Sequence, residues 1–236
     1  MSGSAGKSFG AVCFDCDSTL SRIEGIDELA VRAGVAAQIA PLTTAAMNGM
    51  LALDEIYAER LRLVRPCRAS LDWLGERYVE EMVCGAKEAV ETLHRLRKSV
   101  YIVSGGLLPG IIPLAAALGI ARDRVHAVDV SFDASGEYRD FDRRSPLTRA
   151  DGKADVCRAI AERHGPVAMI GDGVTDLAAR AGGAFVVGYG GVVARDVVRA
   201  GADIFVPNSD LTAVLSAILS ECELKIAGVG SSGRFI

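Results

Sequence analysis

The sequence lacks an excess of charge of either sign. It contains 26 lysine and arginine residues against 30 aspartate and glutamate residues, which gives a formal net charge of −4. A chain without a strong positive field has no general electrostatic attraction to nucleic acids or to anionic membranes. Arginine is locally dense in residues 59–68, and that spacing fits the solvated face of a helix about as well as a binding patch. We therefore expect no nucleic-acid partner.

Targeting and membrane signals are also missing. The opening residues "MSGSAGKS" lack the apolar stretch of a secretory signal, and no strand precedes Gly6-Lys7-Ser8 to make it a P-loop. Residues 101–121 carry no charge, which is long enough for a membrane span. Glycines and prolines between 105 and 113 interrupt this segment, and so indicate a strand, a turn and a helix. We expect a cytoplasmic protein without a membrane partner.

Histidine is scarce, and the cysteines show no metal-site spacing. The three histidines are isolated, and the six cysteines are spread over 236 residues, which is typical of reduced thiols in a cytoplasmic protein. Cys13 and Cys16 form a C-x-x-C, but on an extended strand such positions point to opposite faces. They could not share a disulfide or a zinc ion without a turn between them. We expect Cys13 to pack in the core and Cys16 to be incidental to a turn.

Short apolar runs alternate with helical stretches along most of the chain. Half of the residues are hydrophobic, which suffices for a substantial core. The runs "GAVCFD", "SVYIVSG", "VAMIGD", "AFVVG" and "DIFVP" predict buried strands. Helices are expected near 87–98, 108–119, 153–164, 174–182, 192–201 and 210–222. This alternation predicts an α/β fold with a parallel sheet flanked by helices.

Two segments interrupt the alternation. Residues 21–85 have helical spacing and no convincing strand, and so predict a helical insertion. Residues 125–142 alternate at period two around Ser135-Gly136, which is typical of a β-hairpin. We expect a discontinuous core of residues 9–20 and 86–222. The last residues, 223–236, show little pattern and are expected to form a loose tail.

Polar residues gather where the predicted strands end. Because ligands of open α/β sheets bind outside the carboxyl ends of the strands, these residues are expected to share one edge. Acidic residues there suit a hard cation, and a lysine and glycine N–H groups suit an anion. The residues are Asp15, Asp17, Ser104, Gly105, Gly106, Lys153, Asp172 and Asp176. The structural alternative is that Asp15 and Asp17 cap a helix that starts near Ser18.

These motifs resemble those of a known family. "DCDST" (15–19), the serine of "VSGG" (103–106), Lys153 and "GDGVTD" (171–176) resemble the motifs of the haloacid dehalogenase superfamily of phosphohydrolases. Within it, "CFDCDSTLSRIEGIDELA" (13–30) and "SFDASGEYRDFD" (131–142) are similar to the phosphoserine phosphatases. The resemblance extends from about residue 9 to 220. It implies a Rossmann-like core with a helical cap inserted after the first strand.

The resemblance also implies catalytic roles. Asp15 would be the nucleophile that forms an aspartyl-phosphate, and Asp17 the general acid and then the base. Mg²⁺ would be required, because a carboxylate attacks an anionic phosphate only after charge neutralisation. Its protein ligands would be Asp15, Asp172 and the backbone carbonyl of Asp17. Ser104 and Lys153 would bind phosphoryl oxygens. Asp176 would orient Lys153 or a metal-bound water.

Substrate recognition is assigned to the cap by the same resemblance. Glu24 would face the substrate ammonium and Arg60 the carboxylate, a pairing that suits both charges. Without the resemblance, Glu24 would be a helix-start acid and Arg60 an exposed arginine. Further substrate contacts are expected at Ser104, Gly105, Lys153, Thr175 and Arg195. The sequence departs from the family at Asn48, at Leu53, where an aromatic is common, and at Val192, where asparagine is common.

The expected activity is magnesium-dependent hydrolysis of O-phospho-L-serine, a step of serine biosynthesis, with this small phosphomonoester as the partner. Hydrolysis of another small phosphomonoester, such as phosphothreonine, is an alternative. A second alternative is a phosphotransferase that passes the aspartyl-phosphate to an alcohol. A non-catalytic binding module is disfavoured, because it would not need both Asp15 and Asp17. A homodimer is an open alternative to a monomer.

Overall fold

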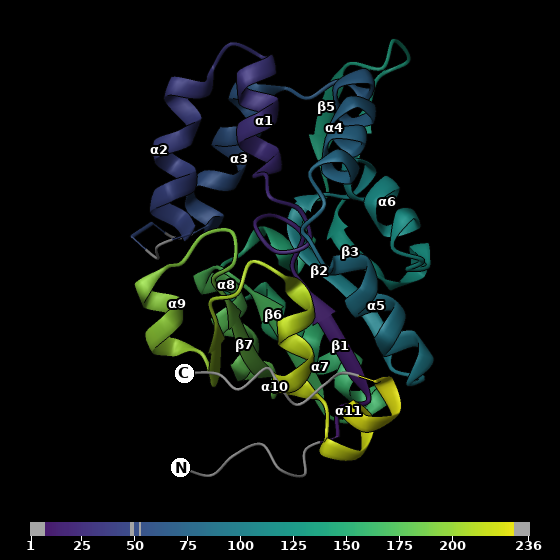
Figure 1. Ribbon diagram of the computed structural model, residues 1–236. Coiled ribbons are helices and arrows are strands. Elements are labelled where there is room, and N and C mark those ends of the chain that lie inside the picture. The colour runs from purple at the N-terminus through teal and green to yellow at the C-terminus, as the bar shows by residue number, and fades with distance from the viewer. Residues whose placement is uncertain (1–7, 48–49, 52, 229–236) are drawn as a thin grey trace.

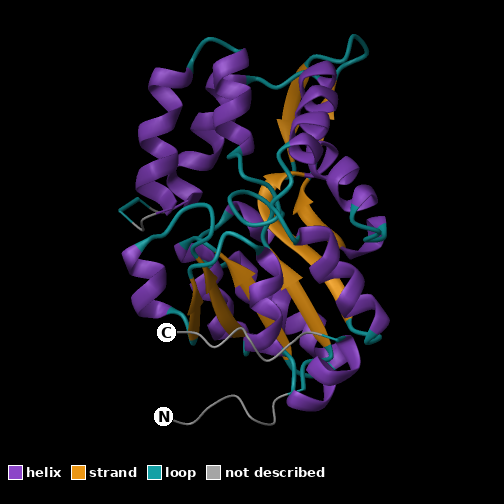
Figure 2. Ribbon diagram, viewed as in Figure 1, coloured by secondary structure: helices purple, strands orange, loops and turns teal. Residues whose placement is uncertain are grey.

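The structure is a computed structural model that describes residues 8–47, 50–51 and 53–228. Its centre is a six-stranded sheet in the order β3-β2-β1-β6-β7-β8, in which all neighbouring strands are parallel. Figure 2 shows these strands in the lower and central parts of the molecule, flanked by helices. The strands span Ala11–Phe14, Ser99–Leu107, Val125–Val128, Val167–Gly171, Phe185–Tyr189 and Ile204–Val206 for β1, β2, β3, β6, β7 and β8.

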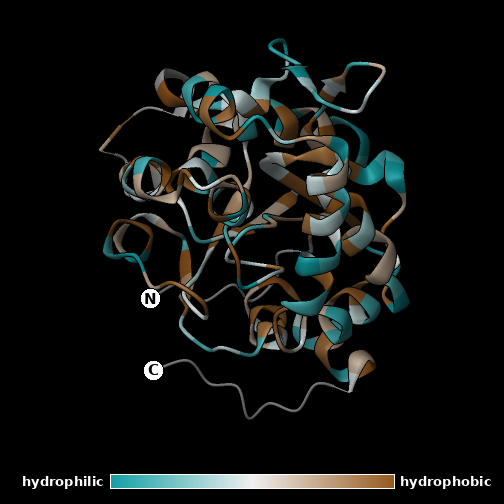
Figure 3. Cartoon of the chain, turned by 90° about the horizontal axis from the view of Figure 1, so that it is seen from above, coloured by the Kyte–Doolittle hydropathy of each residue, from teal (hydrophilic) through white to brown (hydrophobic). Residues whose placement is uncertain are grey.

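The sheet is the apolar core that the sequence predicts. Every residue of β1 and of β6 is buried, which explains why these runs are continuous in apolar residues instead of alternating. Figure 3 shows that hydrophilic segments gather toward the periphery of the molecule. Cys13 and Cys16 are both fully buried, and all six cysteines, which lie in the described part of the chain, are free. The structure pairs none of them in a disulfide, and their reduced state in the cell stays a prediction.

The helices of the core follow the predicted alternation with shifted ends. They are α5 (Ala86–Arg95), α6 (Leu108–Ala117), α7 (Gly152–His164), α8 (Val174–Ala178), α9 (Asp196–Gly201), α10 (Leu215–Ile218) and α11 (Glu221–Ala227). Residues 101–121 contain most of β2 and all of α6, so the expected strand and helix are present, but no turn separates them. Among the described residues, no helix is both long and apolar enough to cross a bilayer.

Helices α1 (Gly25–Arg32), α2 (Ala36–Met47), α3 (Leu53–Val64) and α4 (Arg68–Glu80) lie between β1 and β2 in the sequence. In Figure 1 they lie above the carboxyl edge of the sheet, with α1, α2 and α3 grouped together and α4 next to α6. The helical insertion is thus found where the sequence predicts it. An isolated antiparallel bridge between Ser21 and Met82 joins its two ends.

Several boundaries differ from the expectations. Residues 125–128 are not part of a hairpin, because they form β3 and pair in parallel with β2. The hairpin is shorter and consists of β4 (Val130–Phe132) and β5 (Tyr138–Phe141). Its turn is at the expected place, where Gly136 has a φ of 86° and donates to the carbonyl of Asp133, a conformation that glycine adopts without strain.

The C-terminal region also corrects two predictions. The stretch 192–201 is helical only from Asp196, and the stretch 210–222 is broken between α10 and α11. Residues 223–227 are not a loose tail, because they belong to α11, whose first turn is capped by Ser220 and Glu223. Glu223 also forms an ion pair with the buried Lys98, which directly precedes β2. This pair fastens α11 to the core.

Candidate active site

The candidate site lies at the point where the chain reverses its direction of travel across the sheet. From the central β1, the chain builds β2 and β3 on one side and then β6, β7 and β8 on the other. Open α/β sheets bind ligands at such a switch point, outside the carboxyl ends of the strands. Asp15 directly follows β1, and its backbone N–H donates to the carbonyl of Ile170 at 2.9 Å. Asp172 directly follows β6, so both acids reach the same crevice.

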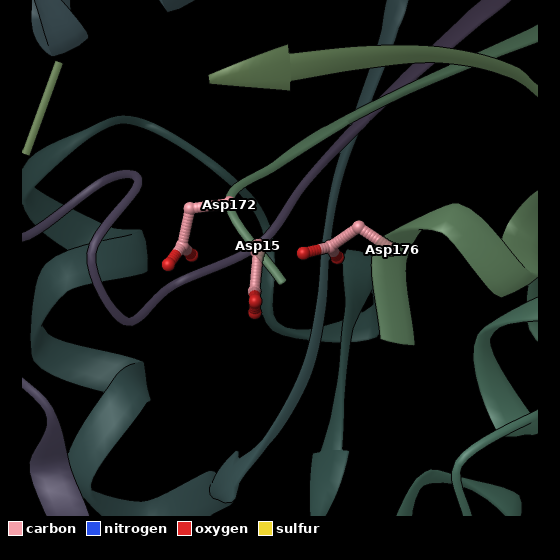
Figure 4. Close-up of side chains that lie close together, drawn as sticks. All are labelled: Asp15, Asp172 and Asp176. Atoms are coloured by element: carbon pink, nitrogen blue, oxygen red, sulfur yellow. The ribbon is translucent and has the colours of Figure 1, made fainter. Parts of the chain in front are cut away.

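Three carboxylates meet in this crevice. Each of Asp15, Asp172 and Asp176 offers an oxygen that lies within 4.8 Å of the others, and Figure 4 shows Asp15 between the other two. All three side chains are buried. Burying like charges together is unfavourable unless cations compensate, so the donor set fits a hard cation. Among the described residues, the cluster contains Asp176, which was expected to orient other groups, and not the carboxylate of Asp17.

Lys153 supplies one positive charge to the cluster. It lies in the first turn of α7, and its Nζ is 2.8 Å from Asp15 Oδ2 and 2.6 Å from Asp176 Oδ1. Burial alone would lower the pKa of Lys153, but Asp15 and Asp176 raise it above its ordinary value. Asp176 also accepts from the Gly173 N–H at 2.9 Å. A Cβ on Gly171 would lie 2.1 Å from Asp176 Cγ, so only glycine allows this approach.

Desolvation and mutual repulsion set the protonation of the carboxylates. Burial raises the pKa of Asp172 to about 8, with contributions from Asp176 and Asp15 that the nearby Arg195 partly opposes. Burial likewise raises the pKa of Asp176 to about 6, although Lys153 opposes the shift. A divalent cation among these oxygens would favour their ionised forms. The cluster is thus poised to exchange protons for a metal ion.

Asp17 is held by the helical insertion. Its Oδ1 accepts from Tyr78 Oη at 2.6 Å and from the Gly25 N–H at 2.7 Å, so α4 and α1 both contact it. A Cβ on Gly25 would lie 2.0 Å from Tyr78 Oη, so glycine is required there. Burial, followed by repulsion from Asp15, raises the pKa of Asp17 to about 6, against the lowering effect of Tyr78 and Gly25. This pKa suits a group that gives and takes protons near neutrality.

The alternative that Asp15 and Asp17 cap a helix near Ser18 is wrong. Residues 15–20 form a turn, and the next helix begins at Gly25. Asp15 Oδ1 instead accepts from the Cys16 N–H at 2.7 Å. Ser104 lines the same pocket as Asp15 and Asp17, is buried, and accepts from the Gly106 N–H at 3.0 Å. The predicted turn after Ser104 is an extended segment, because β2 continues to Leu107 with a register shift against β3.

Glu24 and Arg60 line the same pocket as Asp15, Ser104 and Lys153. Glu24 precedes α1 without making a capping hydrogen bond, and accepts instead from Ser18 Oγ at 2.8 Å. Arg60 is 5% exposed, so it is not the exposed arginine of the structural alternative. Within the described part of the chain, its buried Nε has no hydrogen-bond partner.

Arg195 and Thr175 have different positions. Thr175 lines the pocket and is buried. Arg195 Nε is 3.1 Å from Asp172 Oδ2, and an Nη atom of Arg195 lies 3.6 Å from Glu24 Oε1. The structure therefore places Arg195 between two acids of the site and not among the residues that line the pocket. Val192 is half-buried and packs against the apolar core.

Two tyrosines of the site were not predicted from the sequence. Tyr78 donates to Asp17, and Tyr57 lines the pocket from α3. They lie 61 and 48 residues from their hydrogen-bond partners, and no local pattern marks them. Asn48 lies outside the described residues, as does the side chain of Leu53. Tyr57, one turn beyond Leu53 on α3, presents an aromatic ring to the pocket.

Comparisons with known proteins agree with this geometry. The chain is 39% identical over 201 residues to the chloroplastic phosphoserine phosphatase of Arabidopsis thaliana, covering 84% of this chain and 68% of that protein. It is 37% identical over 191 residues to the phosphoserine phosphatase of Mus musculus, with 80% and 85% covered. A solved structure described as a phospho-aspartyl intermediate analogue of phosphoserine phosphatase matches with a TM-score of 0.76 and 26% identity, covering 90% of this chain and all of that one (100%).

The profile of a protein family matches as well. It covers residues 9–183 and is described as that of haloacid dehalogenase-like hydrolases. The match includes all the strand-end acids, Ser104 and Lys153, together with the helical insertion that holds Asp17. The chain belongs to the haloacid dehalogenase-like hydrolase family.

Proposed function

We propose that the protein is a magnesium-dependent phosphoserine phosphatase, which hydrolyses O-phospho-L-serine to L-serine and phosphate through an aspartyl-phosphate. One observation carries the proposal. A single pocket is lined both by Asp15, Ser104 and Lys153, which suit a phosphate, and by Glu24 and Arg60, which suit an ammonium and a carboxylate. The names of the relatives in Arabidopsis and mouse support the same substrate.

The nucleophile in this proposal is Asp15. One of its carboxylate oxygens attacks phosphorus, the bond between phosphorus and the serine oxygen breaks, and the phosphoryl group is transferred to Asp15. Lys153 contacts Asp15 directly and would bind the phosphoryl oxygens with Ser104 and with N–H groups of the extended segment after it. These donors are positioned before the reaction, which stabilises the charge that develops in the transition state.

Asp17 is the proposed acid and base. In its protonated form it gives its proton to the serine oxygen as that oxygen leaves, and in its ionised form it takes a proton from the water that attacks the aspartyl-phosphate. A water oxygen then replaces Asp15 on phosphorus, and phosphate is released. The pKa of about 6 allows both forms near neutral pH. Tyr78 and the Gly25 N–H hold the carboxylate in one orientation.

The buried carboxylate cluster fits a divalent metal. Asp15, Asp172 and the backbone carbonyl of Asp17 are the proposed Mg²⁺ ligands, and Asp176 is proposed to orient Lys153. When bound, Mg²⁺ would neutralise phosphate charge and so allow an anionic nucleophile to approach. Asp176 is already engaged by Lys153 and by the Gly173 N–H, which supports an orienting role for it.

Recognition of the amino-acid end is proposed for the insertion. We propose that residues 21–85 form a cap over the core, that Glu24 binds the ammonium and that Arg60 binds the carboxylate. The unpaired Nε of Arg60 supports this role, because a buried donor without a partner is costly and a ligand carboxylate would satisfy it. Gly105 and Thr175 line the same pocket and are proposed to contact the substrate.

A role in serine biosynthesis follows from this substrate. A cytoplasmic location and a homodimer stay predictions, and the relative in Arabidopsis is named as chloroplastic.

Phosphate release from a panel of phosphomonoesters tests the proposed function. The panel contains O-phospho-L-serine, O-phospho-L-threonine and O-phosphoethanolamine, each with and without Mg²⁺. We expect magnesium-dependent release with a strong preference for O-phospho-L-serine. Equal rates with all three esters would overturn the proposed substrate, and a phosphorylated alcohol formed in place of free phosphate would identify a phosphotransferase.

A further inference from the structure

Tyr57 joins the two ends of the pocket. It lies on α3 three residues before Arg60, and only 5% of its surface is exposed. Its Oη donates to the backbone carbonyl of Gly105 at 2.9 Å, directly after Ser104 in the phosphate-binding segment. Burial raises the pKa of Tyr57 above its ordinary value, so the hydroxyl stays protonated and remains a donor.

The ring of Tyr57 is fixed from the opposite side. Phe141 of β5 packs against it, with ring centroids 5.2 Å apart and planes inclined by 55°, a geometry that aromatic pairs favour. The guanidinium carbon of Arg60 lies 5.7 Å from the centroid of the Tyr57 ring, within the range of a cation–π contact. The only hydrogen bond of Arg60 that the structure describes is a long one of 3.4 Å to Thr43 Oγ1. The Tyr57 ring is therefore one of the contacts that hold the Arg60 guanidinium.

We infer that Tyr57 is a positioning residue that sets the distance between Arg60 and the segment 104–106, which is proposed to bind the phosphate. By fixing this distance, Tyr57 selects phosphoesters by the length of the carbon chain between their phosphate and carboxylate groups. The inference rests on the proposed function. The phosphate and the carboxylate belong to one small substrate. Tyr57 contacts the backbone of Gly105 near the proposed phosphate site and the side chain of Arg60 at the proposed carboxylate site. A substrate with one more methylene group cannot satisfy both ends while this spacing is kept.

The test compares O-phospho-L-serine with O-phospho-L-homoserine, which is longer by one methylene group. Tyr57→Phe keeps the ring and removes the hydrogen bond to Gly105. The ratio of kcat/KM for the shorter ester to that for the longer one is expected to fall roughly five-fold, as for one net hydrogen bond. Phe141→Leu, which leaves the hydroxyl but loosens the ring, is expected to lower the ratio as well. The whole 236-residue chain with Mg²⁺ is used throughout.

Tyr138→Phe is the matched control. Tyr138 is a buried tyrosine of the same hairpin as Phe141 and does not line the pocket, so its variant is expected to keep the wild-type ratio. If folded Tyr57→Phe keeps the wild-type ratio, whether kcat/KM falls equally for both esters or does not fall at all, Tyr57 only packs and the inference is overturned. If Tyr57→Phe does not fold, the ratio in Phe141→Leu decides in the same way. A wild-type chain inactive on O-phospho-L-serine would instead overturn the proposed function.

Discussion

The sheet edge and the helical insertion hold their charged groups in different ways. At the edge, Lys153 is paired with two carboxylates, and Asp172 is paired with Arg195. In the insertion, Arg60 is just as buried, yet its Nε has no partner within the described residues. The edge can therefore assemble without a substrate, whereas the insertion leaves a donor for a ligand to satisfy. The difference suggests that chemistry and recognition are separable in this pocket.

Replacing the proposed nucleophile is expected to have the largest effect. Asp15→Asn keeps the shape but removes the nucleophilic charge, so phosphate release should fall by at least about a thousand-fold with every ester. Release is measured with excess Mg²⁺ by a continuous phosphate assay. Asp140→Asn, at a half-buried position of β5 outside the pocket, is the control. Substantial activity in Asp15→Asn would show that another group attacks phosphorus.

Replacing Lys153 is expected to cause the next largest loss of activity. Lys153→Met keeps the length of the side chain and removes its charge, which leaves Asp15 and Asp176 without their shared cation. We expect kcat/KM to fall on the order of 100-fold with all esters and the thermal midpoint to fall as well. Lys87→Met changes an exposed lysine of α5 and should alter neither value. A loss limited to O-phospho-L-serine would mean that Lys153 recognises the substrate. It would contradict the assignment of chemistry to the sheet edge and of recognition to the insertion.

Tyr78 links the insertion to the chemistry. Its hydrogen bond lowers the pKa of Asp17, so Tyr78→Phe is expected to raise that pKa further and to move the basic limb of the kcat/KM profile upward by about half a pH unit to one unit. The profile is measured between pH 5 and 9 at saturating Mg²⁺. Tyr138→Phe should leave the limb in place. A profile that stays fixed in Tyr78→Phe would argue against Asp17 as the titrating acid.

The smallest effect is on stability without metal. Because burial raises the pKa of Asp172 to about 8, the folded metal-free chain binds this proton more tightly than the unfolded chain. This contribution to the free energy of unfolding is present at low pH and is lost as the pH rises through about 8. The thermal midpoint without Mg²⁺ should therefore fall by a few degrees between about pH 5.5 and about pH 8.

Added Mg²⁺ should reverse that trend. The metal binds the ionised carboxylates, so it should raise the thermal midpoint more at pH 8 than at pH 5.5. Scanning calorimetry at the two pH values with and without Mg²⁺ checks both statements. A stabilisation by Mg²⁺ that is equal at both pH values would contradict the assignment of the cluster as the metal site.

The edge was more predictable from the sequence than the insertion. Asp15, Asp172 and Lys153 stand directly beside strand or helix ends, so local pattern and sheet topology place them together. Tyr57 and Tyr78 were missed because their roles depend on how helices pack over the edge, which no local spacing encodes. The strand β3 was missed because it is only four residues long and is separated from β4 by one residue, so the sequence runs from one strand into the next without a turn signal.

The comparison between edge and insertion is tested most directly by Arg60→Ala with two substrates. O-phosphoethanolamine lacks the carboxylate of O-phospho-L-serine but keeps its phosphate and ammonium groups. We predict that kcat/KM falls about 30-fold or more for O-phospho-L-serine and stays near the wild-type value for O-phosphoethanolamine. Arg62→Ala, at an exposed arginine of α3, should change neither. Equal losses of kcat/KM with both substrates in Arg60→Ala would contradict the claim that Arg60 acts by recognising the substrate carboxylate.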